Sequence, residues 1–244
     1  MSTHFHRSRR VALALAAAWP LAASAFDVHR LFGVKGSGRI ARQPIDVGEF
    51  DGIELAGDVV CELSQNQPPR VMLEVDDNLL PLIEVTVKDR SLRLRKRESM
   101  SPTRLRLVVD VWRLERIVLS GSSTLRSDQL VAKSLSLRVS GSGALRLPVL
   151  TAETLLLQAG GSGVIDVGGQ ANELSASLGG SGVLDASKLQ VRRVSVALGG
   201  SAVATVWATD DLSGKTGGSS VLRYRGEPRV SVGSGGSSRV VHKE

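Results

Sequence analysis

A glycine–serine pair recurs through the second half of the chain at a nearly constant interval, and this repeat limits the fold more than any other feature. From one serine to the next, the intervals are 20, 20, 19, 20, 18 and 18 residues. The glycines of the pairs are Gly121, Gly141, Gly161, Gly180, Gly200, Gly218 and Gly236. Such a regular period indicates a repeated structural unit rather than a compositional bias.

The residues around each pair alternate between apolar and polar. Aliphatic side chains recur three positions after the serine, as at Leu125, Leu145 and Ile165, whereas the position four before it is mostly polar or small. This period of two predicts strands with one face inside and the other outside. A unit of about 20 residues is too short for a crossover helix, but it fits one coil of a β-solenoid, in which each strand pairs with its equivalent in the next coil.

The pattern therefore predicts an all-β fold with a parallel β-helix-like solenoid over residues 117–244. Its coils contain 18–20 residues, and a glycine with positive φ stands at each corner because glycine adopts that conformation without strain. We expect the serines of neighbouring corners to form hydrogen bonds along the stack.

The preceding residues, 43–116, lack the period but are also rich in β-strand patterns. The predicted strands cover residues 53–63, 70–75, 84–87, 91–95 and 104–111. A hairpin turn is expected at residues 88–91, and a short helical turn interrupted by Pro81 at residues 78–83. The sequence thus predicts a β-rich half followed by the solenoid.

The first 25 residues have the pattern of a signal peptide. Arg7, Arg9 and Arg10 precede an apolar run, and Ala23-Ser24-Ala25 fits a cleavage site. Removal of this segment lowers the formal net charge from +7 to +4, because it holds three arginines and no acidic residue. We expect an exported protein, whether periplasmic, attached to the outer surface or secreted, with a short N-terminal segment at 26–42 and no transmembrane segment in the mature chain.

A cluster of basic residues precedes the solenoid. Ten Lys and Arg residues against four Asp and Glu lie between Lys88 and Arg116. One interpretation is an anion-binding strip for envelope polysaccharide or lipopolysaccharide, formed by Arg93, Arg95, Arg97, Arg104 and Arg106. The other is a solvated strand face that prevents edge-to-edge pairing. We expect no nucleic-acid partner, because no aromatic residues alternate with the arginines as stacking platforms.

Few residues suggest catalysis. Asp166 and Asp185 occupy equivalent positions in neighbouring coils, about 4.8 Å apart if the strands pair, close to the separation of the carboxylates in a retaining glycosidase. Arg146, one coil earlier, could offset their repulsion. A calcium site is not expected, because half of this column is arginine, and calcium needs six or more oxygen ligands.

The other residues that could take part in catalysis also argue against an enzyme. Residues 213–216 resemble the end of a phosphate-binding loop but lack its first glycine and a following helix. His29, His242 and the single cysteine, Cys61, do not readily form a catalytic triad or a zinc site. We therefore expect no cofactor and no metal.

Three segments together resemble a known family. These are Phe50-Asp51-Gly52-Ile53-Glu54-Leu55, Asp77-Asn78-Leu79-Leu80 and the string of glycine–serine corners. They are similar to the head GIN domain of putative auto-transporter adhesins, over residues 36–244. The resemblance implies an exported, repetitive β protein with a right-handed solenoid in its second half, and it supplies no catalytic residues. Because residues 240–244 directly follow the last corner, we do not expect a self-transport domain.

The sequence thus favours a non-enzymatic cell-envelope protein, an adhesin-like structural or interaction module. Its partner could be an anionic envelope polysaccharide, lipopolysaccharide or another envelope protein. The alternative is a polysaccharide-active enzyme on a parallel β-helix that uses Asp166 and Asp185.

Overall fold

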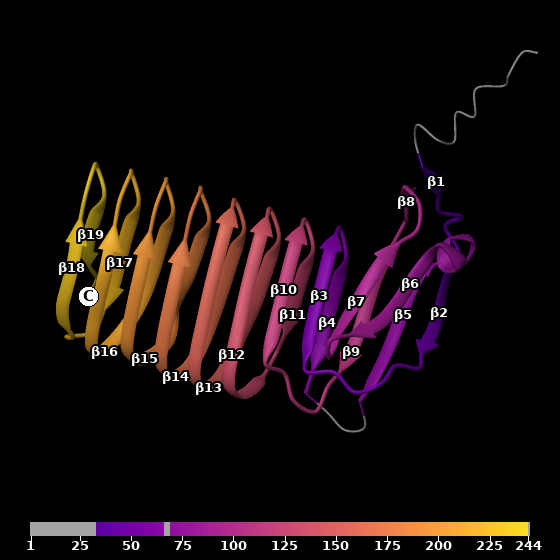
Figure 1. Ribbon diagram of the computed structural model, residues 1–244, viewed down its shortest axis with the longest axis horizontal. Helices are drawn as coiled ribbons and strands as arrows, with labels where there is room; N and C mark the ends of the chain where they lie inside the picture. The colour runs from indigo at the N-terminus through magenta and orange to yellow at the C-terminus, as the bar shows by residue number, and fades with distance from the viewer. Residues whose placement is uncertain (1–32, 66–68, 244) are drawn as a thin grey trace, which may run out of the picture.

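The computed structural model describes residues 33–65 and 69–243, which form an elongated stack of β-strand coils (Figure 1). The predicted signal peptide lies outside the described residues, as does the first part of the segment predicted at 26–42. Strands account for 70% of these described residues and helix for 3%. The predicted all-β solenoid is therefore confirmed.

Each coil has two faces that meet at a glycine corner and, on the opposite edge, at what we call the second corner. The strands of the first face run toward the glycine corner, and those of the second face run away from it. The shorter strands of the stack are β3 (Gly52–Gly57), β4 (Val60–Ser64), β10 (Arg116–Gly121), β11 (Thr124–Ser127), β17 (Val221–Arg225), β18 (Arg229–Ser234) and β19 (Arg239–His242). The longer ones, which bend around the second corner, are β12 (Leu130–Gly141), β13 (Ala144–Gly161), β14 (Val164–Leu178), β15 (Val183–Leu198) and β16 (Val203–Thr216).

Neighbouring coils pair in parallel, with equivalent residues in register. Leu137, for example, pairs with Leu157, which in turn pairs with Ala176. All three side chains are buried. The aliphatic positions of the repeat thus form continuous rows between the two faces, and the burial of these rows is the main driving force for stacking.

The glycine corners form the upper edge in Figure 1. All seven predicted corner glycines have a positive φ, between 66° and 86°. A Cβ at Gly180 would lie 2.6 Å from the carbonyl oxygen of Gly161, so the coils also approach too closely there for a side chain. Glycine is thus required both by its backbone conformation and by the spacing of the coils.

The serines of these corners connect the coils through their backbone, which corrects the expectation of side-chain bonds. The N–H of Ser181 donates to the carbonyl oxygen of Gly161 at 2.8 Å, and the N–H of Ser201 donates to that of Gly180 at 2.7 Å. The serine side chains themselves are exposed. The reason is that the positive φ of each glycine turns the next N–H along the stack and the next side chain outward.

The stack includes a coil that the period did not predict. Residues 53–63 were expected to form one strand, but the structure divides them between β3 and β4 at Gly57, whose φ is 94°. Gly57 is the register partner of Gly121, and β4 pairs in parallel with β11. The coil formed by β3 and β4 therefore lies directly against the first coil of the sequence repeat.

The chain between these two coils builds an N-terminal cap together with the residues before β3. Its elements are β1 (Val34–Lys35), β2 (Ile40–Ile45), β5 (Arg70–Asp76), the 3-10 helix η1 (Asp77–Leu82), β6 (Ile83–Lys88), β7 (Ser91–Lys96), β8 (Met100–Ser101) and β9 (Leu105–Asp110). β7 pairs in parallel with β3, and β9 with β4, which continues both faces by one layer. Beyond them β6, β5 and β2 pair in antiparallel fashion and end the parallel stack.

Two local predictions in the cap are confirmed. The hairpin between β6 and β7 turns at Asp89 and Arg90, whose φ values of 51° and 58° are typical of a two-residue turn. The predicted helical turn is η1, which contains Pro81.

Candidate functional site

The five arginines of the predicted anion-binding strip lie on two different faces. Arg93 and Arg95 belong to β7, which continues the first face, whereas Arg106 belongs to β9, which continues the second. Arg97 and Arg104 lie in the connections on either side of β8. The structure therefore does not bring all five side chains into one continuous strip.

Acidic neighbours engage three of these arginines. Arg93 lies 2.8 Å from Glu54, and Arg97 lies 3.7 Å from Glu84. Arg106 pairs with two carboxylates, as described below. Arg95 and Arg104 are exposed and form no ion pair within 4 Å among the described residues. These two are the arginines of the set that remain free for an anionic partner.

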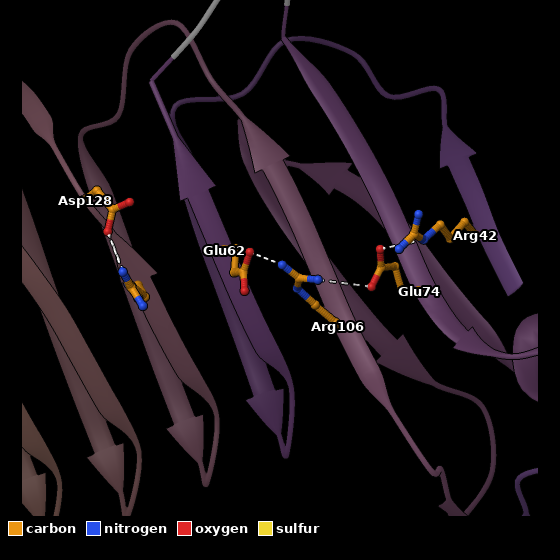
Figure 2. Close-up of polar contacts among 6 residues, drawn as sticks. Arg42, Glu62, Glu74, Arg106 and Asp128 are labelled. Carbon is orange, nitrogen blue, oxygen red and sulfur yellow. Dashed lines mark hydrogen bonds and ion pairs between the residues drawn. The ribbon is translucent and has the colours of Figure 1, made fainter. Parts of the chain in front are cut away.

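The pairs of Arg106 belong to a row of alternating charges across the second face (Figure 2). Glu74 of β5 lies between Arg42 of β2, at 3.0 Å, and Arg106 of β9, at 3.3 Å. Arg106 also contacts Glu62 of β4 on its other side. The hydrogen bond that Arg106 donates to Glu62, together with the negative charges of Glu62 and Glu74, raises the pKa of Arg106.

This row stabilises the junction between the cap and the first coil. The side chain of Glu74 is only 6% exposed, so its charge must be compensated within the protein. Arg42 and Arg106 supply that compensation from opposite sides. The alternating charges across β2, β5, β9 and β4 are therefore structural, and the sequence did not predict them because Glu74 lies outside the repeat.

A second buried acid holds the outer part of the cap together. Asp76 is fully buried, and its two carboxylate oxygens accept the N–H groups of Gly38 at 2.7 Å and Thr103 at 2.8 Å. Burial opposes its ionisation, but the hydrogen bonds from Gly38, Thr103 and Arg104 together hold the pKa of Asp76 below its ordinary value. The ionised side chain thus connects two loops to the end of β5. One loop joins β1 to β2, and the other joins β8 to β9.

Asp166 and Asp185 are register partners in β14 and β15, as their spacing predicted. Arg146 of β13 lies 3.3 Å from Asp166. Asp185 accepts hydrogen bonds from Ser187, including one from its N–H at 3.0 Å, and these hold the pKa of Asp185 below its ordinary value. A glycosidase needs one carboxyl group with a raised pKa as its acid, and the environment of Asp185 acts in the opposite direction.

The other residues that were considered for catalysis or binding do not lie together in one site. Cys61 is buried on β4, and burial raises its pKa to about 12, so the thiol is inert at neutral pH. Residues 213–216 lie within strand β16 instead of a phosphate-binding loop. His242 stacks on Tyr224 at the last coil. Across residues 33–65 and 69–243, no group of three or more His, Cys, Asp and Glu side chains could hold a metal ion.

Comparison with protein families identifies the chain. Residues 49–228 match the family described as "putative auto-transporter adhesin, head GIN domain". The chain belongs to this family. The match starts just before β3 and ends between β17 and β18, so it includes most of the stack and all of the cap from β5 to β9. A search of curated proteins found no match.

Solved structures share the fold of this head GIN domain protein. A putative adhesin from Bacteroides fragilis is 21% identical, with a TM-score of 0.81, and covers 86% of this chain and 100% of its own. A putative adhesin from Parabacteroides distasonis is 27% identical, with a TM-score of 0.69, over 86% and 99% of the two chains. A putative lipid binding protein from the same species is 20% identical, with a TM-score of 0.75, over 86% and 99%.

In the part of the chain that the structure describes, no helix has the length and apolar character needed to span a bilayer.

Proposed function

We propose that this head GIN domain protein is an exported, non-enzymatic module of the cell envelope that binds its partner through the surface of the solenoid. The observation that carries the proposal is the stack itself. Equivalent side chains recur in register from coil to coil, at intervals of about 4.8 Å. Extended repetitive surfaces of this kind are what solenoid proteins use for binding, and membership of an adhesin family agrees with such a use.

Export is tested by cell fractionation. We expect the full chain to be found in the envelope or the medium, with a mature N-terminus near Phe26. Replacing the three arginines of the leader with glutamate should retain the uncleaved chain in the cytoplasm. Recovery of wild-type protein in the cytoplasm with residues 1–25 intact would contradict the proposal.

Substitutions in the cap test whether the partner binds the basic residues there instead of the solenoid surface. If an anionic polysaccharide or lipopolysaccharide binds there, exposed Arg95 and Arg104 should contribute most, and binding should weaken as salt screens the charges. A pull-down of envelope components at low and high salt, repeated with Arg95→Gln and Arg104→Gln, measures this. Arg93, Arg97 and Arg106 are already paired with carboxylates, so Arg97→Gln is a control of similar exposure. Capture that resists both salt and the substitutions would exclude this surface.

The alternative function, a polysaccharide-active enzyme, is favoured only by the adjacency of Asp166 and Asp185. A screen of neutral and acidic polysaccharides with the wild type and the double alanine variant decides between the two. If the wild type cleaves a polysaccharide and the variant does not, the protein is an enzyme and the binding proposal is wrong. We expect no turnover by either protein.

A further inference from the structure

We propose that the second corner of the solenoid is a binding groove for an extended, net-neutral, β-1,4-linked polysaccharide. The inference rests on the proposed function, and it names the ligand class and the surface. It concerns the edge opposite the glycine corners, the lower edge in Figure 1, where the coils turn from the second face to the first.

Two hollows lie along this edge and share a residue. The first has a volume of about 730 Å³ and extends from Trp112 to Val131. The second, of about 670 Å³, extends from Val131 to Thr209. Because Val131 lines both, the two hollows adjoin along this edge, and together we call them the corner groove.

The floor and walls of the corner groove follow from the register of the coils. Ala132, Ala152 and Ala171 are register partners whose small side chains form the floor. One wall consists of Thr151, Gln170 and Gln190, also register partners. The opposite wall consists of Lys133, Glu153, Asn172 and Arg192. Small residues between two rows of long ones make the corner concave.

The spacing of these rows matches a sugar chain. Equivalent side chains in neighbouring coils are about 4.8 Å apart, and an extended β-1,4-linked chain advances about 5 Å per pyranose ring. Each ring would therefore lie one coil further along the groove than the ring before it, and because successive rings are turned over, equivalent sugar groups would meet the walls at every second coil. The side-chain amides of Gln170, Gln190 and Asn172 can both donate and accept hydrogen bonds, as the hydroxyl groups of a sugar require.

Trp112 supplies the apolar contact at one end. Its side chain is 65% exposed, the most exposed large apolar side chain of the described residues. Its backbone is nevertheless fixed, because the amide of Gln65 donates to the carbonyl oxygens of Trp112 at 3.2 Å and Val131 at 2.9 Å. A large, rigid aromatic surface with a polar edge is suited to packing against the C–H face of a pyranose ring.

Charge and backbone pairing argue against other polymers. The groove is lined by two acidic and two basic side chains, Asp128, Glu153, Lys133 and Arg192, so it has no net charge to attract a polyanion. An extended peptide usually binds by adding a strand to a free sheet edge. At this corner the strands β13, β14 and β15 are paired on both sides, and the backbone of Val131 in β12, which pairs with β13 on one side, is bonded by the side chain of Gln65.

The test is titration calorimetry of the mature protein with β-1,4-linked hexamers and dimers of glucose and of N-acetylglucosamine. We expect at least one hexamer to bind at least tenfold more tightly than its dimer, because only the hexamer spans several coils. Binding should change less than twofold between low and high salt. This distinguishes it from capture through the cap arginines.

Trp112→Ala and the double variant Gln170→Ala/Gln190→Ala should each weaken hexamer binding at least tenfold. All these side chains are solvent-accessible, and circular dichroism and a melting curve verify the fold of each variant. Ser162→Ala/Ser181→Ala, on the glycine corner, is the matched control and should bind as the wild type does. Absence of hexamer binding at millimolar concentration, or binding unchanged in both groove variants, overturns the inference. The pull-down of envelope components then still decides the proposed function separately.

Discussion

The backbone N–H of Ser122 donates a hydrogen bond to the carbonyl oxygen of Gly57 at 2.6 Å. It joins two coils between which the chain leaves the stack, forms most of the cap and returns. The glycine corner therefore continues without a break from the repeat into the coil of β3 and β4. Since the cap continues both faces by a further layer, the parallel stack ends on this side in antiparallel strands.

Adjacent glycines at one corner should differ sharply in their tolerance of a side chain. Gly180 has a φ of 76°, and a Cβ there would lie 2.6 Å from the carbonyl oxygen of Gly161. Gly180→Ala should therefore lower the free energy of unfolding by about 1–3 kcal/mol. At Gly179, which has open space around it, alanine should be neutral or slightly stabilising. Urea denaturation of the two variants measures the difference in unfolding free energy. Equal losses of stability would mean that a Cβ at Gly180 does not strain the corner.

Corner serines should be dispensable where their side chains face solvent and important where they point inward. Ser181 is exposed and contributes its N–H to the ladder, which alanine retains. Ser220 is fully buried, and its hydroxyl donates to the carbonyl oxygen of Gly217 at 2.8 Å. Ser220→Ala should cost about 0.5–1.5 kcal/mol, and Ser181→Ala less than 0.5 kcal/mol. A larger loss of stability in Ser181→Ala than in Ser220→Ala would contradict this assignment.

The arginines of the cap should separate into structural and free residues. Arg106→Gln leaves the buried carboxylate of Glu74 with Arg42 as its remaining partner, so we expect a loss of about 1–3 kcal/mol in unfolding free energy. Arg95→Gln should leave the melting temperature unchanged, because Arg95 is exposed. Thermal unfolding of both variants tests the distinction. An unchanged melting temperature in Arg106→Gln would mean that the charge row does not stabilise the junction.

The fold could be predicted to the extent that the repeat is visible in the sequence. Seven corners share the glycine–serine pair at a fixed interval, but Gly57 is followed by Asp58 and is separated from the others by the cap. Its equivalence to Gly121 depends on where the chain returns to the stack, which is a long-range property. For this reason residues 53–63 had the pattern of a single strand.

The candidate site was less predictable, because it depends on which strands become neighbours. Along β7, Arg93 and Arg95 alternate with buried leucines, which is a local pattern, but no local pattern shows that β9 joins the other face. The pairing of Arg106 with Glu74 arises from the antiparallel register of β5 and β9. By contrast, Asp166 and Asp185 lie within the periodic region, and there the register followed from the interval alone.

The buried carboxylate of Asp76 should make the cap sensitive to acid. Its folded pKa lies below the ordinary 3.8, so the stability that it contributes is present above that value and is lost as the pH falls through the folded pKa. At neutral pH, Asp76→Asn should cost about 1–3 kcal/mol, because an amide offers one acceptor oxygen for the two N–H groups of Gly38 and Thr103.

Urea denaturation of wild type and Asp76→Asn between pH 7 and pH 2 measures this effect. The difference in unfolding free energy should narrow below about pH 4, because only the wild type must protonate this buried group. Asp46→Asn, a change at an exposed carboxylate of the cap, is the control and should match the wild type at pH 7. A gap between wild type and Asp76→Asn that stays constant across the whole range would show that the hydrogen bonds of Asp76 do not depend on its ionisation.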